Sequence, residues 1–126
     1  MSYRAQSISM YRGDKAILSN VSIDVEPGRV TILIGPNGAG KSSLLSVMSG
    51  DESSEAGRVL LDDDDISNLT PAQLANRRAV MSQSASVVFD FSVEEILQMG
   101  WVQEQWGRHT MEQTVRELAR QCGVSE

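Results

Sequence analysis

The chain has 126 residues, of which 40% are hydrophobic and 22% are charged, and its formal net charge is -6 at pH 7. This composition is typical of one small soluble domain or a part of one. No apolar run approaches the roughly 20 residues that a membrane-spanning helix needs, and the acidic balance argues against a nucleic-acid partner, because phosphate backbones bind basic surfaces. The first residues lack the apolar segment of a secretory signal, so we expect a cytoplasmic chain.

The first third of the chain predicts a strand, a glycine-rich loop and a helix in direct succession. Residues 16–25 end in an apolar–polar alternation that indicates a half-buried strand. Residues 29–34 (RVTILI) form a short β-branched run typical of a fully buried strand in a parallel sheet. After the loop, a helix that Gly50 can terminate is expected to carry four apolar side chains on one stripe. These are Leu44, Leu45, Val47 and Met48.

The middle of the chain combines a strand, an acidic run and a helix start. Residues 58–61 predict a strand. The four consecutive acids at 62–65 predict a solvated turn and not a calcium loop, since EF-hand loops alternate their acids and contain a glycine. Thr70 to Gln73 form a capping box with Pro71 at the first helical position, which predicts a helix to about Arg77.

The last third predicts one strand and two helices. Residues 79–83 (AVMSQ) are typical of a short strand. A second capping box, Ser92–Glu95, opens a helix that Gly100 ends. A third, Thr110–Gln113, is expected to open a helix over residues 111–122, with Val115, Leu118, Ala119 and Cys122 on its apolar face.

The glycine-rich loop, residues 35–42 (GPNGAGKS), matches the phosphate-binding pattern GxxxxGK[ST]. Glycines let backbone N–H groups converge on a phosphate without Cβ collisions, and the following helix adds its positive end. Lys41 would reach the β- and γ-phosphates of a nucleotide, and the Ser42 hydroxyl would contact Mg²⁺. An accidental glycine-rich turn is the alternative, and the flanking strand and helix patterns count against it. The residues expected to hold ATP are Gly35, Pro36, Asn37, Gly38, Ala39, Gly40, Lys41, Ser42 and Ser43.

Other candidates are weak on pattern alone. Gln83, a lone glutamine at a strand end, is usually a solvated polar residue. Tyr11 and the pair Phe89 and Phe91 are usually packing aromatics. The single cysteine, Cys122, has no partner at ligand spacing and is interpreted as a structural thiol. His109, the only histidine, is interpreted as an exposed loop residue.

The sequence resembles the ATP-binding subunits of ABC transporters. Residues 20–45 (NVSIDVEPGRVTILIGPNGAGKSSLL) are similar to the family's strand, turn and Walker A segment, residues 56–66 to its following hairpin, and residues 77–83 to the approach to its Q-loop. The resemblance implies an α/β P-loop NTPase of ABC type, with a parallel core sheet and an antiparallel edge sheet. Residues 1–84 would form the RecA-like ATP-binding core and residues 85–126 the start of a helical subdomain, with the C-terminal half of the domain absent.

The resemblance also implies roles for single residues. Lys41 and Gln83 take catalytic positions, and Gln83, as the Q-loop glutamine, would contact Mg²⁺ and the attacking water. Mg²⁺ would therefore be held by Ser42 and Gln83 together with the nucleotide. The aromatic residue that stacks on adenine in many members aligns with Arg12, beside Tyr11, and either side chain could stack.

Within the family, residues 70–83 and 89–100 are most similar to ATP-binding subunits of hemin importers, which group with siderophore and vitamin B12 importers. This implies a homodimer at the cytoplasmic face of the inner membrane, bound to a transmembrane permease and served indirectly by a periplasmic substrate-binding protein. Two alternatives stay open: an importer for a siderophore or vitamin B12, and a truncated, non-catalytic nucleotide-binding fragment, because the family's Walker B and signature motifs do not occur in these residues. An ABC ATPase of DNA repair or translation is disfavoured by the acidic balance and the importer-like segment.

Overall fold

The computed structural model describes residues 1–81, 90–100 and 108–124. By its internal contacts the chain divides into two compact units, Met1–Val80 and Met81–Glu126, and each unit is described by itself. Within the described residues, no helix is both long enough and apolar enough to cross a membrane.

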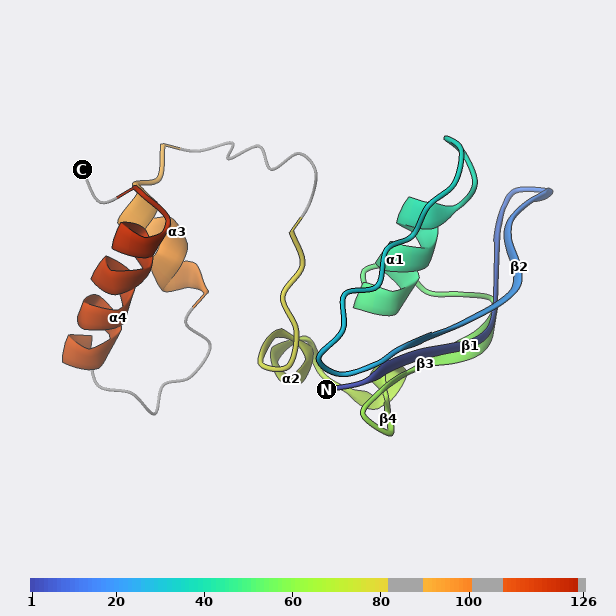
Figure 1. Ribbon diagram of the computed structural model, residues 1–126, viewed down its shortest axis with the longest axis horizontal. Helices are drawn as coiled ribbons and strands as arrows, with labels where there is room; N and C mark the ends of the chain where they lie inside the picture. The colour runs from blue at the N-terminus through green and yellow to red at the C-terminus, as the bar shows by residue number, and fades with distance from the viewer. Residues whose placement is uncertain (82–89, 101–107, 125–126) are drawn as a thin grey trace. The chain divides into compact units, whose positions relative to one another are not determined.

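The first unit is built on a four-stranded antiparallel sheet in the order β2-β1-β3-β4 (Figure 1). The strands are β1 (Tyr3–Arg12), β2 (Lys15–Val25), β3 (Ala56–Leu61) and β4 (Asp64–Asp65). The strand predicted at 16–25 is confirmed as β2, and the one predicted at 58–61 is confirmed as part of β3. The acidic run begins with the expected turn, and its last two residues pair with the end of β3.

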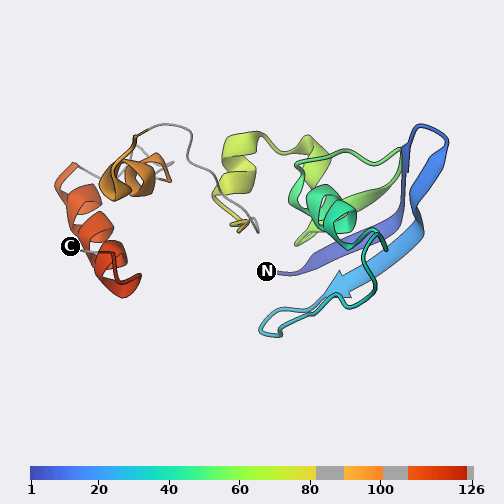
Figure 2. The same ribbon diagram turned by 90° about the horizontal axis from the view of Figure 1, so that it is seen from above.

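Helix α1 (Lys41–Ser49) lies against one face of this sheet (Figures 1 and 2). It ends as predicted at Gly50, whose φ of 80° is the left-handed conformation that favours glycine. Of the four side chains predicted on one stripe, Leu44, Val47 and Met48 are buried, whereas Leu45 is exposed. The core cluster between helix and sheet consists of Ala5, Ile8, Met10, Leu18, Leu44, Val47, Met48, Val59, Leu61, Ile66 and Leu74.

A short 3₁₀ helix, η1 (Ile66–Asn68), and helix α2 (Pro71–Ala75) follow the sheet. The predicted capping box is confirmed: the backbone N–H of Gln73 donates to Thr70 Oγ1 at 3.3 Å, and that of Thr70 donates to Gln73 Oε1 at 2.8 Å. The helix ends at Ala75, two residues earlier than expected.

The structure contradicts the strand predicted at 29–34 and the described part of the strand predicted at 79–83. Residues 29–34 belong to no strand, and Val30, Ile32 and Ile34 are 90%, 73% and 90% exposed. Residues 79–81 also form no strand, and the rest of the predicted segment, including Gln83, lies outside the described residues. The physical reason is that a parallel strand needs hydrogen-bonded neighbours, and every strand pair in the described part of the chain is antiparallel.

The second unit contains α3 (Val93–Met99) and α4 (Arg108–Gln121), which pack on each other. The capping box at the start of α3 is confirmed, with the Glu95 backbone N–H donating to Ser92 Oγ at 3.2 Å, and the helix ends at Gly100 as predicted.

The start predicted for the last helix is wrong. Helix α4 already begins at Arg108, so Thr110 stands inside its first turn and is not its cap. A threonine fits a helix interior at little cost, so the cap pattern alone did not fix the boundary. Of the predicted apolar face, Val115 is buried whereas Leu118 and Cys122 are exposed.

Candidate nucleotide-binding site

The glycine-rich loop leads directly into α1, and two of its glycines have conformations that other residues rarely adopt. Gly38 and Gly40 have φ angles of 81° and 84°. A Cβ on Gly40 would lie 2.8 Å from the backbone oxygen of Ile17 and 2.9 Å from Leu18 Cδ2. Glycine at position 40 therefore allows α1 to begin in close contact with β2.

The N-terminus of α1 carries no side-chain cap. Helices α2 and α3 are different, because a capping box at each satisfies N–H groups of the first turn. In α1 the first helical bond runs from the Leu44 N–H to the Gly40 carbonyl at 2.8 Å. The N–H groups before it lie at the positive end of the helix dipole and can bind an anion. This donor set fits the phosphates of a nucleotide.

Lys41 is the first residue of α1, and its side chain turns back to the loop. Its Nζ donates to the carbonyl oxygens of Gly35 at 2.8 Å and Pro36 at 2.7 Å. The loop is closed further by the Ala39 N–H, which donates to the Pro36 carbonyl at 3.3 Å. The ammonium group is therefore held beside the backbone that would surround a phosphate. Its two acceptors are uncharged carbonyl oxygens, which bind an ammonium group more weakly than a charged phosphate oxygen does.

The predicted adenine contacts lie at the end of β1. The Arg12 guanidinium is paired with Glu52, at 3.0 Å from Oε1. The backbone N–H of Tyr11 donates to Glu55 at 3.1 Å, and Tyr11 as a whole is 48% exposed. Arg12 is thus engaged by an acidic side chain, whereas the Tyr11 ring faces solvent in part. Gln83, the other predicted site residue, lies outside the described residues.

The acidic run forms a structural ion-pair cluster. Arg77 donates to Asp64 at 2.7 Å and to the Leu61 carbonyl at 3.0 Å. The backbone N–H of Ser2 donates to Asp62 at 2.8 Å and is the main reason why the pKa of that carboxyl lies below its usual value. Within the described residues, no group of three acidic, histidine or cysteine side chains is placed to hold a metal ion.

A glycine-rich loop that opens an uncapped helix packed on a sheet defines the class of phosphate-binding-loop proteins. Residues 18–126 match the family model described as ABC transporter. The chain belongs to this family, whose general reaction is ATP hydrolysis and whose domain binds nucleotide.

The curated relatives of this chain agree with the family model. The hemin import ATP-binding protein HmuV of Agrobacterium fabrum is 44% identical over 117 residues, which are 93% of this chain and 45% of that protein. The protein of the same name from Pseudomonas fluorescens Pf-5 is 40% identical over 122 residues, or 97% of this chain and 48% of that protein. The chain thus spans about half the length of these relatives.

Among solved structures, a nucleotide-free ATP-binding cassette from an ABC transporter superposes with a TM-score of 0.76 at 30% identity. The match covers 99% of this chain and 55% of that one. The α/β ATP-binding-cassette fold predicted from the sequence is therefore confirmed, as is the similarity to hemin import ATP-binding proteins.

Proposed function

We propose that this chain is the phosphate-binding half of an ATPase subunit that drives an ABC importer. The observation that carries this proposal is the uncapped start of α1, with glycines in left-handed conformations before it and Lys41 beside it. In the proposed complex, the N–H groups of the loop and of the first turn of α1 bind the phosphates of ATP. Lys41 exchanges its two carbonyl partners for phosphate oxygens, which are charged and therefore stronger acceptors.

Further roles complete the proposed site. Ser42 is exposed at the start of α1, and its hydroxyl would hold Mg²⁺, which offsets the phosphate charge when bound. Gln83 would contact the same ion and orient the attacking water. For adenine we favour Tyr11, because stacking by Arg12 would require it to release Glu52.

The test compares the two lysines of the chain, Lys41 and Lys15. Binding of a fluorescent ATP analogue with Mg²⁺ is measured by titration for the Lys41→Ala and Lys15→Ala variants. Lys41→Ala is expected to weaken binding by about tenfold or more, the effect of one charge-assisted hydrogen bond. Lys15 is exposed on β2 and its replacement should leave binding unchanged. Equal affinities of the two variants would contradict the proposal.

A second candidate is a chain that binds nucleotide without hydrolysing it. The described site supplies donors for the phosphates, in the first turn of α1 and on Lys41, whereas hydrolysis also needs a carboxylate near the water and charge stabilisation of the γ-phosphate. Phosphate release by the purified chain distinguishes the two. Turnover that disappears in Lys41→Ala would rule out the non-catalytic candidate.

For the whole protein we propose hemin, or a related iron chelate, as the imported substrate, on the strength of the relatives named above. The subunit would act as a homodimer on a transmembrane permease at the cytoplasmic face of the inner membrane, with a periplasmic substrate-binding protein delivering the substrate. Deletion of the gene should abolish growth on hemin as sole iron source and spare growth on ferrous salts. Loss of growth only on a ferric siderophore, or loss of vitamin B12 uptake, would assign the corresponding alternative substrate.

A further inference from the structure

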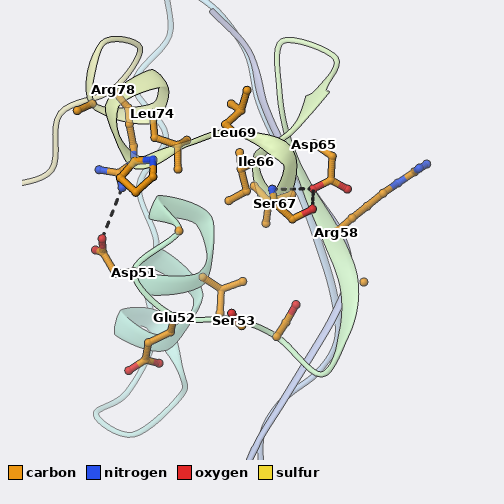
Figure 3. Close-up of a pocket in the computed structure, with 17 residues that line it drawn as sticks. Asp51, Glu52, Ser53, Arg58, Asp65, Ile66, Ser67, Leu69, Leu74 and Arg78 are labelled. Atoms are coloured by element: carbon orange, nitrogen blue, oxygen red, sulfur yellow. Dashed lines mark hydrogen bonds and ion pairs between the residues drawn. The ribbon is translucent and has the colours of Figure 1, made fainter.

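A second concave site lies at the other end of α1, away from the phosphate-binding loop (Figure 3). The pocket has a volume of about 500 Å³ and lies between the C-terminal turn of α1, the loop at 50–54, β3, η1 and α2. Small-molecule sites commonly span roughly 300 to 1,000 Å³, so the pocket has room for a small ligand. It shares no residue with the loop at 35–43.

One part of the pocket wall is apolar and preformed. Its side chains belong to the core of the unit and are at most 9% exposed, so they are fixed by packing on the sheet. These residues are Val47, Val59, Ile66 and Leu74. An apolar ligand group placed against them would lose water contact without requiring the core to rearrange.

Arg78 stands at the edge of this apolar wall and lacks a well-formed acceptor. Its side chain is only 18% exposed, and its Nε has no hydrogen-bond partner among the described residues. The ion pair that it forms within the described residues, to Asp51 Oδ1, is long at 3.5 Å, and the other Asp51 oxygen accepts the Ser49 hydroxyl at 2.6 Å. The neighbouring Arg77, by comparison, forms a short ion pair of 2.7 Å with Asp64.

The remaining charged groups of the pocket are already paired. Asp65 accepts both the N–H and the hydroxyl of Ser67, at 3.0 and 2.7 Å. Arg58 donates to Gln6 at 2.8 Å and, in Figure 3, points away from the pocket. A largely buried guanidinium without a good acceptor is costly. The unmet requirement of this pocket is therefore an acceptor, preferably an anionic one.

We propose that this pocket binds a small organic carboxylate. The carboxylate accepts hydrogen bonds from the Arg78 guanidinium, which is shaped for paired contacts to such a group. The apolar body of the ligand lies on the wall formed by Val47, Val59, Ile66 and Leu74. Asp51 competes with the ligand for Arg78, because the ligand has to replace the 3.5 Å contact between Asp51 and the guanidinium.

The test uses three probes with the same six-carbon body: hexanoate, hexanol and hexylamine. Methyl resonances of Val47, Ile66 and Leu74 are followed by NMR while each probe is titrated into the chain. Hexanoate is expected to give saturable shifts confined to the pocket, and hexanol and hexylamine are expected to bind at least about tenfold more weakly, since they lack the anionic acceptor. Absence of saturation with hexanoate, or equal binding of hexylamine, would overturn the proposal.

Two variants test the role of Arg78. Arg78→Met should weaken hexanoate binding by about tenfold or more, and Arg120→Met, which removes an exposed arginine paired with Glu117, should not. Asp51→Asn keeps Arg78 and weakens its internal competitor, so it should tighten hexanoate binding even if Arg78→Met fails to fold. Weaker binding in Asp51→Asn would contradict the proposed competition.

Discussion

At the scale of single residues, Gly40 and Lys41 define the geometry of the candidate site. Both were predicted from the loop pattern, as were all other residues of the loop. The ion pairs of Arg77 and Arg78 could not be predicted, because they join residues that lie 13 to 27 positions apart in the sequence. Local patterns carry no information on contacts of that range.

Gly40→Ala tests the close contact between α1 and β2. The variant adds a Cβ 2.8 Å from the Ile17 carbonyl at a φ of 84°. Gly38→Ala is the matched control, because its φ of 81° is nearly the same and no atom lies within 4 Å of the added Cβ. Both variants should lose about 1 to 2 kcal/mol from the left-handed conformation, and Gly40→Ala about 1 to 3 kcal/mol more from the collision. Urea unfolding measures both, and equal losses would show that the contact is easily relieved.

At the scale of elements, the sequence predicted those that are specified locally. The starts of α2 and α3 follow from capping boxes, each of which lies within four residues. Strand β1 was not predicted, because bulges interrupt its alternation: the register with β2 shifts between Ala5 and Ile8, and Ser7 has a φ of 53°. Residues 29–34 have a strand-like composition, but composition does not supply the neighbours that a strand requires.

The turn between β3 and β4 makes the fold sensitive to acid. The pKa of Asp62 is lowered, first by the hydrogen bond from the Ser2 N–H and then by contacts that include Arg77. Because the folded-state pKa lies below the unfolded one, the stabilisation is present above the unfolded pKa and is lost as the pH falls through the folded pKa. The free energy of unfolding of the wild type should therefore decrease below about pH 4.

The pH dependence can be assigned by substitution. Asp62→Asn should reduce its slope in that range, and Arg29→Met, which removes an arginine paired with Glu26, should leave it unchanged. The measurement is urea unfolding at a series of pH values. A slope in Asp62→Asn as steep as in the wild type would assign the acid sensitivity to other carboxyls.

At the scale of the whole molecule, the exposed apolar side chains of residues 30–34 are expected to affect behaviour in solution. Val30, Ile32 and Ile34 occur within five residues and are largely exposed, and an exposed apolar segment of this kind promotes association. We expect the isolated chain to aggregate at micromolar concentrations. Its fold is also expected to be marginal, and a cooperative thermal transition well above ~65 °C would contradict this.

Ile32→Thr tests the source of the aggregation. The variant should lower light scattering at a given concentration with little loss of stability, because Ile32 makes few contacts to lose. Ile66→Thr is the contrasting change, since Ile66 is buried and its substitution should destabilise the unit. Unchanged light scattering in Ile32→Thr would show that the aggregation arises from a surface other than residues 30–34.

The uncapped start of α1 has a thermodynamic consequence. The capping boxes of α2 and α3 satisfy N–H groups of the first turns with side chains of the chain itself, so these two helix starts require no ligand. Helix α1 leaves that position to a ligand, and a ligand that binds only the folded form raises the free energy of unfolding with the logarithm of its concentration. The melting temperature of the first unit should therefore rise with the concentration of free nucleotide. Amide hydrogen exchange in the first turn of α1 should slow as the nucleotide concentration rises.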